Sequence, residues 1–121
     1  MNEKLKIWVR TLLLEYCQTV KYRKASPADG YPRIVFKIDI WEQSEMEAGV
    51  LTIWVWNNNE STVELDGIAD KLKHKLSGLS YLDDNFYIFF DDARVQIEDD
   101  TKLFGSRITV NYHYKGKEQM K

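Results

Sequence analysis

The fold is decided by the stretch Asp83-Asp84-Asn85-Phe86-Tyr87-Ile88-Phe89-Phe90-Asp91-Asp92-Ala93-Arg94, an aromatic run between two pairs of aspartates. Side chains alternate along an extended chain, so alternate residues from Phe86 to Phe90 point to one face, while Tyr87 and Phe89 point to the other. The aspartate pairs place both ends of the strand in water. Because both faces carry large apolar side chains, we expect a strand inside a sheet that is covered on both sides.

The segment before this strand predicts a helix that continues to about Ser77. Ser61-Thr62-Val63-Glu64 has the spacing of a capping box at its start. Gly78 is placed to end the helix in the left-handed conformation that glycine favours. The apolar residues of this segment recur at helical spacing and form one stripe: Leu65, Ile68, Ala69, Leu72 and Leu76.

The segment after the aromatic strand returns to pair with it. Residues 94–98 predict a short edge segment, and residues 99–102 predict a turn. Residues 103–115 alternate apolar and polar side chains and predict the last strand. We expect the polar residues 116–121 to be a frayed tail.

The first half of the chain predicts a helix and a hairpin. Residues 2 to about 19 carry an amphipathic stripe, with Asn2 as the cap. A loop at residues 21–32 holds both prolines, and strands at residues 33–41 and 50–57 flank an acidic turn. The whole chain, 1–121, is therefore expected to be a single α+β domain. It would have a mostly antiparallel sheet of four to five strands, with the N-terminal and central helices packed on one face.

Composition restricts the classes of function. With 121 residues the chain has the length of one domain, and its net charge of −2 argues against binding driven by nucleic-acid phosphates. The short basic clusters around Arg23 and Lys117 are interpreted as solvated surface. The single cysteine, Cys17, cannot form an internal disulfide, and no apolar run is long enough to span a membrane. We expect a protein of the cytosol when it is made, with no nucleic-acid or membrane partner.

The residues that could carry catalysis show no catalytic arrangement. Adjacent aspartates on a strand point to opposite faces, so the three aspartate pairs are better explained as strand ends and turns than as a metal site. Cys17, His74 and His113 lack the spacing of metal ligands, and the glycines form no phosphate-binding loop. We therefore expect neither an enzyme nor a cofactor.

The tryptophans are the more informative feature. Trp41, Trp54 and Trp56 lie close together on two neighbouring strands. They are either core residues beneath the helices or part of a sheet face that packs on a partner, since interfaces favour tryptophan, tyrosine and arginine. Stacking of single-stranded RNA on these rings is a weaker interpretation, because their surroundings are acidic.

The pattern over nearly the whole chain resembles the tail-terminator proteins of long-tailed bacteriophages and prophages, also called tail completion or minor tail proteins. The features that carry the resemblance are turn residues and aromatic alternation: the N-terminal helix, Gly30 to Phe36, Ile53 to Asn57, Ile68 to Leu72, Leu76 to Leu79, Asp83 to Phe90 with Arg94, Asp99-Asp100, and Arg107 to Tyr112.

The resemblance implies a structural subunit that assembles into a ring, typically a hexamer, at the head-proximal end of the tail tube. Such a ring stops tube polymerisation, and its partners are other copies of itself, the tail-tube protein and the head–tail connector. Its location would be the neck of the virion. The residues expected at interfaces are Asp29, Tyr31, Trp54, Trp56, Arg94 and Arg107.

Three alternatives stay open at the level of sequence. Another neck component, such as a head-closure or connector-adaptor protein, shares the small size and the ring. A small metal-dependent nuclease would use the aspartate pairs as ligands. A host immunity or antitoxin protein would present its acidic turns to a basic partner and form a one-to-one complex.

Overall fold

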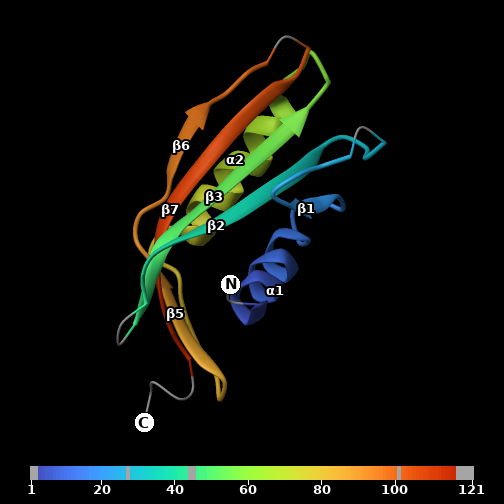
Figure 1. Cartoon of the computed structure of the whole chain (residues 1–121). Helices are drawn as coiled ribbons and strands as arrows, with labels where there is room; N and C mark the ends of the chain where they lie inside the picture. The colour runs from blue at the N-terminus through green and yellow to red at the C-terminus, as the bar shows by residue number, and fades with distance from the viewer. Residues whose placement is uncertain (1–2, 27, 44–45, 101, 117–121) are drawn as a thin grey trace.

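The computed structural model describes residues 3–26, 28–43, 46–100 and 102–116. The described chain forms two helices and a seven-stranded sheet (Figure 1). The elements follow in the order α1 (Glu3–Leu13), β1 (Val20–Tyr22), β2 (Arg33–Gln43), β3 (Glu47–Asn57), α2 (Val63–Leu76), β4 (Ser80–Leu82), β5 (Phe86–Phe90), β6 (Arg94–Ile97) and β7 (Phe104–Gly116).

Strand β7 is the centre of the sheet, whose order is β1-β2-β3-β7-β5-β4. Along one side it pairs with the whole length of β3. Its other side pairs first with β6 and then, further along, with β5. Every pairing is antiparallel except that of β1 with β2, which is parallel. The fold is therefore α+β with a mixed, mostly antiparallel sheet.

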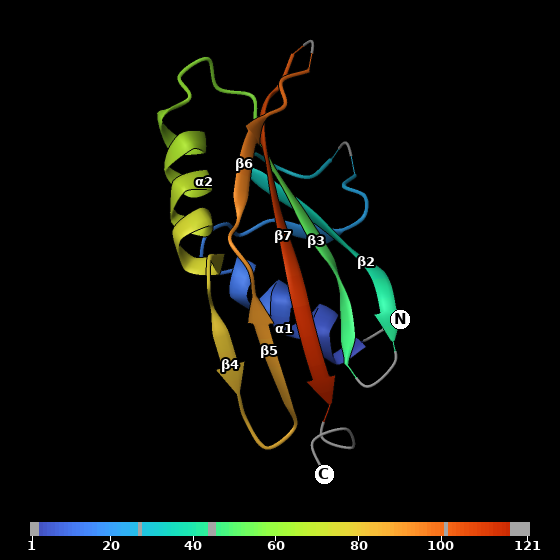
Figure 2. The ribbon, with the colours of Figure 1, turned by 90° about the vertical axis from the view of Figure 1, so that its left-hand side faces the viewer.

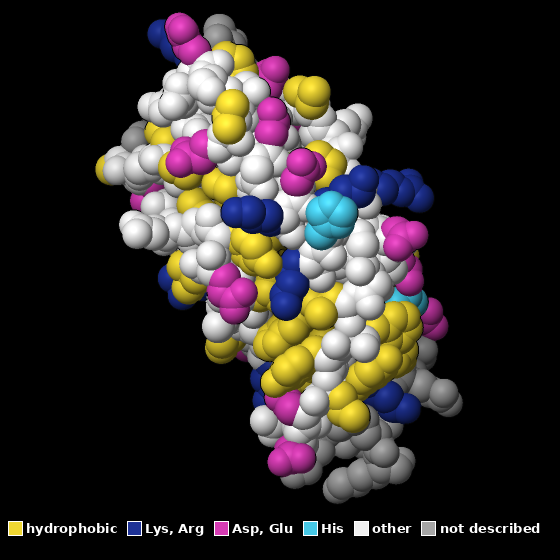
Figure 3. Space-filling model, turned by 180° about the vertical axis from the view of Figure 1, so that it is seen from behind, with side chains coloured by type: hydrophobic (Ala, Val, Ile, Leu, Met, Phe, Trp, Pro, Cys, Tyr) yellow, Lys and Arg dark blue, Asp and Glu magenta, His cyan; other side chains and the backbone are white. Residues whose placement is uncertain are grey.

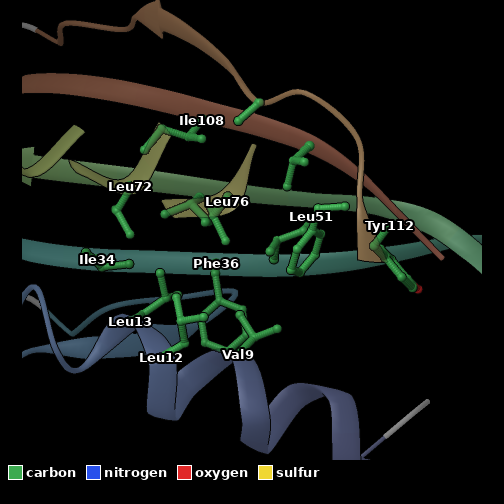
Figure 4. Packing of buried hydrophobic residues seen from close by; sticks show 14 of the residues in the cluster. Val9, Leu12, Leu13, Ile34, Phe36, Leu51, Leu72, Leu76, Ile108 and Tyr112 are labelled. Atoms are coloured by element: carbon green, nitrogen blue, oxygen red, sulfur yellow. The ribbon is translucent and has the colours of Figure 1, made fainter. Parts of the chain in front are cut away.

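Both helices cover the same face of the sheet, as predicted. Ile34, Phe36 and Ile38 of β2 are buried on that face, whereas Lys37 and Asp39 alternate with them and face the other way. The buried residues of α1, α2 and the strands form one hydrophobic cluster, part of which is shown in Figure 4. In Figure 2, α2 stands beside the sheet on this side. We call the uncovered side the open face.

The open face corrects one sequence prediction. The aromatic strand β5 was expected to be covered on both sides, but Tyr87 and Phe89 are only half-buried. Their ring centroids lie 5.7 Å apart with the rings tilted against each other, and Phe89 stacks on His113 of β7 at 4.3 Å. Aromatic neighbours on the same face therefore shield these two rings, without a second layer of secondary structure.

The strand count of four to five was too low, because two three-residue edge strands give almost no signal in the sequence. β1 overlaps the start of the segment expected to be an irregular loop, and β4 has all three residues exposed. The hairpin β2–β3 is also longer than expected, since its strands continue to Gln43 and resume at Glu47. The edge strand β6 and the left-handed Gly78, with φ of 70°, agree with the prediction.

Two helix boundaries differ from the prediction. α1 ends at Leu13, six residues before the expected end, and the chain then turns so that Cys17 and Val20 enter the core. The capping box at α2 does not form. The Thr62 hydroxyl donates to the Asp66 side chain at 3.0 Å, and Glu64 accepts a hydrogen bond from the amide of Asn57. The predicted cap Asn2 and residues 117–121 of the predicted tail lie outside the described residues. Gly116, which was expected to begin that tail, instead ends β7 and pairs with Phe86.

A buried polar contact joins β3 to β7 at the end of the sheet near β5. The Tyr112 hydroxyl donates to Oε2 of Glu47 at 2.8 Å, and both residues are buried. Burial and, secondly, the Glu47 carboxylate raise the pKa of Tyr112 well above its usual range. The folded protein therefore holds this phenolic proton much more tightly than the unfolded chain does.

This difference predicts a loss of stability in alkali. A raised folded pKa contributes stability that is fully present below the unfolded tyrosine pKa, about 10, and falls as the pH rises above it, by up to about 1.4 kcal/mol per pH unit. Denaturant unfolding at several pH values between neutrality and strong alkali will show a steeper decline for the natural chain than for Tyr112→Phe. Equal slopes in the two proteins would contradict the assignment.

Candidate interaction surface

The open face presents a row of side chains that runs across four strands. Val35 of β2 pairs with Trp54, Trp54 with Arg107, and Arg107 with Gln96 of β6. Directly paired residues in antiparallel strands lie on the same face, so this row is continuous. Figure 1 views the sheet from this side, with α2 behind it. Both Trp54 and Trp56 belong to this face and are half-buried, so they are not core residues beneath the helices.

A groove of about 380 Å³ lies at the end of the open face where β2 begins and β3 ends. Its apolar lining comes from Val35, Trp54, Trp56, Leu103 and Ala25, and its charged lining comes from Arg23, Lys24, Arg33 and Asp100. Three cations against one carboxylate leave the groove positive in a chain whose net charge is −2. We call this site the basic groove.

Strand β1 sets the position of one wall of the basic groove. It pairs in parallel with β2, and the amide of Arg23 then donates to the carbonyl of Phe36 at 2.8 Å. Arg23 has a φ of 69°, a left-handed conformation that turns the chain out of β1. Among the described residues, the side chains of Arg23 and Lys24 form no ion pair. Their charges are therefore available to a ligand.

Two of the residues predicted for the interface, Asp29 and Tyr31, support the loop beside the groove. Asp29 accepts a hydrogen bond from the amide of Ser26 at 2.7 Å and lies 3.8 Å from the Lys21 ammonium. The guanidinium of Arg33 stacks over the Tyr31 ring at 4.1 Å, donates to the Tyr31 hydroxyl and also donates to the Ser26 carbonyl at 2.8 Å. Neutral acceptors thus hold Arg33 in place without neutralising its charge.

The two remaining predicted interface residues, Arg94 and Arg107, lie elsewhere on the open face. Arg107 forms an ion pair with Glu98 at 3.3 Å and donates to Gln96, so its charge is already matched within the chain. Arg94 is exposed on the edge strand β6 and lines a separate polar hollow with the aspartates that precede it. The structure therefore brings together Trp54 and Trp56, but not the other four, in the basic groove.

Sequence reasoning missed the cations of this groove. Arg23 and Lys24 were interpreted as solvated surface, because nothing nearby in the sequence indicates a partner for them. The available signal was the pattern of residues 20–22, in which Val20 is buried against β2. Recognising that pattern as a strand would have placed the two cations beside the tryptophans.

A second surface lies on the helix-bearing side. Figure 3 shows hydrophobic side chains gathered over the lower part of that side, where α1 and the β4–β5 hairpin lie. Ile7 is 63% exposed there and Tyr81 39% exposed, beside the ring of Trp8, which packs on Phe86 and Phe90. A hollow of about 390 Å³ opens between α1 and the start of β5. We call this surface the apolar patch.

Cys17 and His113, two side chains that could take part in catalysis, both contact other groups of the chain. The Cys17 thiol is buried and donates to the carbonyl of Pro32 at 3.1 Å, and burial raises its pKa. His113 lies 3.4 Å from Asp91 on the open face. In the described ranges, no three histidine, cysteine, aspartate or glutamate side chains come together as metal ligands. None of the described helices is long and apolar enough to cross a membrane.

Comparison with known proteins places the fold. No protein-family model matches the sequence, and no curated protein does. One similar solved structure, whose name describes no function, is 10% identical with a TM-score of 0.70, covering 95% of this chain and 96% of that chain. Another is a chain in the virion of a native gene transfer agent particle, 13% identical with a TM-score of 0.52, covering 93% of this chain and 90% of that chain. At these identities the likeness shows a shared fold.

Proposed function

We propose that the chain is a structural subunit of a phage-like particle that forms a ring at the head-proximal end of the tail tube. There it ends tube polymerisation and joins the tail to the head connector. The observation that carries the proposal is the likeness, over 93% of this chain, to a chain of a gene transfer agent virion. The resemblance of the sequence to tail-terminator proteins supports the same role.

The two exposed surfaces support assembly as the activity of this fold. A ring subunit contacts a neighbour on each side, the tube below and the connector above, and so needs several separate contact areas. The basic groove lies on the open face and the apolar patch on the helix-bearing face, so one molecule can use both at once. Tryptophan is enriched among the residues that carry most of the binding energy of interfaces, and two tryptophans line the groove while one lies in the patch.

The experiment that tests the proposal measures the mass of the assembled protein and its position on tail tubes. Light scattering over a concentration series, with and without divalent ions and with purified tail-tube protein added, is followed by negative-stain imaging. We expect hexameric rings, and we expect them at one end of the tubes, which then stop growing. A chain that forms a one-to-one complex with an unrelated protein, or that neither self-associates nor binds tube ends, would overturn the proposal. Binding at the connector instead would indicate another neck component.

A further inference from the structure

The basic groove has the chemistry of a receptor for an acidic segment that carries an apolar side chain. Its floor is formed by Trp54, Trp56 and Val35, and its rim by Arg23 and Lys24. A segment with an exposed carboxylate next to an exposed aliphatic residue would match both halves of this lining, and such electrostatic complementarity favours one register over others.

The chain itself carries such a segment at the tip of the β4–β5 hairpin. Leu82 is 66% exposed and is followed by Asp83 and the exposed Asp84. Asp83 stabilises the turn by accepting hydrogen bonds from the amides of Asn85 at 2.7 Å and Phe86 at 3.0 Å, which lowers its pKa. Leu82 pairs with Tyr87 and so projects on the open side of the sheet. The tip is thus a firmly shaped, acidic turn with an aliphatic side chain beside it.

The other aspartate pairs of the described chain match the groove less well. Asp91 and Asp92 lie between the buried residues Phe90 and Ala93, so no exposed apolar side chain adjoins them. The third pair follows Ile97, which is 79% exposed, but the carboxylate next to Ile97, that of Glu98, already pairs with Arg107 at 3.3 Å, and Asp100 already lines the groove.

The groove cannot receive the hairpin tip of its own chain. Trp56 pairs with Gly105 near the start of β7, whereas Phe86 pairs with Gly116 at its end. The strand residues between these two levels span roughly 36 Å in an extended strand. The two matching sites therefore lie at opposite ends of the sheet, and their contact requires a second molecule.

We propose that the basic groove of one subunit receives the Leu82–Asp84 hairpin tip of the next subunit, head to tail. The aliphatic side chain of Leu82 packs on the tryptophans, and the carboxylate of Asp84 pairs with Arg23 and Lys24. Each copy has one groove and one tip, so this heterologous contact propagates from copy to copy and closes into a ring where the rotation permits. This inference rests on the proposed function and names the contact by which the ring forms.

Cysteine cross-linking tests the contact while keeping the charges that make it. Ala25→Cys places a thiol in the groove and Asn85→Cys places one at the tip, and the native Cys17 is buried. After mixing the two variants with a short bismaleimide, we expect a cross-linked dimer that neither variant gives alone. The matched control is Asp92→Cys in place of Asn85→Cys, an exposed position that is expected to give no such dimer.

Charge reversal then tests the pairing itself. Adding Asp84→Lys to the tip variant, or Arg23→Glu with Lys24→Glu to the groove variant, should abolish the cross-link, and combining the two reversed variants should restore it. Lys71→Glu with Lys73→Glu, on the exposed side of α2, should leave it unchanged. A cross-link that survives either single reversal would overturn the proposal.

One chain that carries both cysteines separates this inference from the proposed function. We expect a ladder of cross-linked species that ends at a closed ring. A ladder that stops at a doubly linked dimer would show two-fold pairing and overturn the head-to-tail contact. Rings seen in the microscope without any cross-link would overturn the contact and leave the proposed function standing. Cross-linked rings that do not bind tubes would support the contact and contradict the proposed function, and a chain with neither rings nor cross-links would contradict both.

Discussion

Replacing Phe36 with alanine is expected to lower the free energy of unfolding by about 4 kcal/mol, because it removes a large ring from a fully enclosed site. Phe36 is completely buried on β2, where it faces α1 in Figure 4. Its ring packs edge-on against Tyr22 of β1 at 5.1 Å. The substitution leaves a cavity where the helix, the edge strand and the centre of the sheet meet. Urea unfolding followed by circular dichroism measures the loss.

Phe89→Ala is the matched control, since it removes the same side chain from the same sheet. Phe89 lies half-buried on the open face, so its loss exposes neighbouring rings but leaves no enclosed cavity. We expect a cost of about 1 kcal/mol. Equal losses of unfolding free energy at the two positions would show that the open face is covered in solution, as it would be within an assembly. That result would contradict an uncovered open face in the isolated chain.

Gly49→Ala is expected to destabilise the protein by about 3 kcal/mol, because a methyl group at this position has no space. A Cβ atom there would overlap the backbone carbonyl of Asp39 and lie 2.9 Å from the ring and hydroxyl of Tyr112. The Asp39 carbonyl belongs to the backbone of β2, and the Tyr112 ring is held by its hydrogen bond to Glu47, so the two groups cannot both move aside. Relief of the overlap would require Tyr112 to move away from Glu47. Thermal and urea unfolding both measure the effect.

Gly67→Ala makes the same chemical change as Gly49→Ala but is expected to stabilise the protein. Gly67 lies within α2, and nothing is within 4 Å of the Cβ atom that alanine would add. Alanine is the better helix former, so we expect a gain of roughly 0.5–1 kcal/mol. A loss at Gly67, or no change at Gly49, would contradict the assigned surroundings of these glycines.

The main elements of the fold follow from the sequence because each carries a long periodic signal. The alternation from Ile34 to Ile38 and the helical spacing from Leu65 to Leu76 fix which faces are buried, and the structure places those residues against the core as predicted. Ile40, which was expected on the same face, is only half-buried where the pairing of β2 with β3 shifts register. The short strands β1 and β4 were missed, because three residues cannot establish a period. The end of α1 was placed too far along, because Tyr16 and Cys17 continue the apolar stripe after the helix has turned into a loop.

The candidate site was only partly predictable, since it is assembled by tertiary pairing. Trp54 and Trp56 alternate with Ile53 and Val55, so the sequence places them on one face but does not say which face the helices cover. In the structure Ile53 and Val55 are buried beneath the helices, so the two tryptophans lie on the opposite, open face. Arg23 joins the tryptophans only through β1, whose parallel pairing with β2 depends on how the chain crosses from the end of one strand to the start of the other. Local pattern carries no information about such a crossing.

The position of β7 has a consequence for how the protein is made. Because this strand pairs with β3, β5 and β6, the sheet cannot be completed until all thirteen residues of β7 have left the ribosome. Until then, β3 presents a long apolar edge with Trp54 and Trp56 beside it, and unpaired edges of this kind promote aggregation. A nascent chain that stalls before β7 is therefore a natural target for chaperones, and its contacts of high sequence separation predict slow folding.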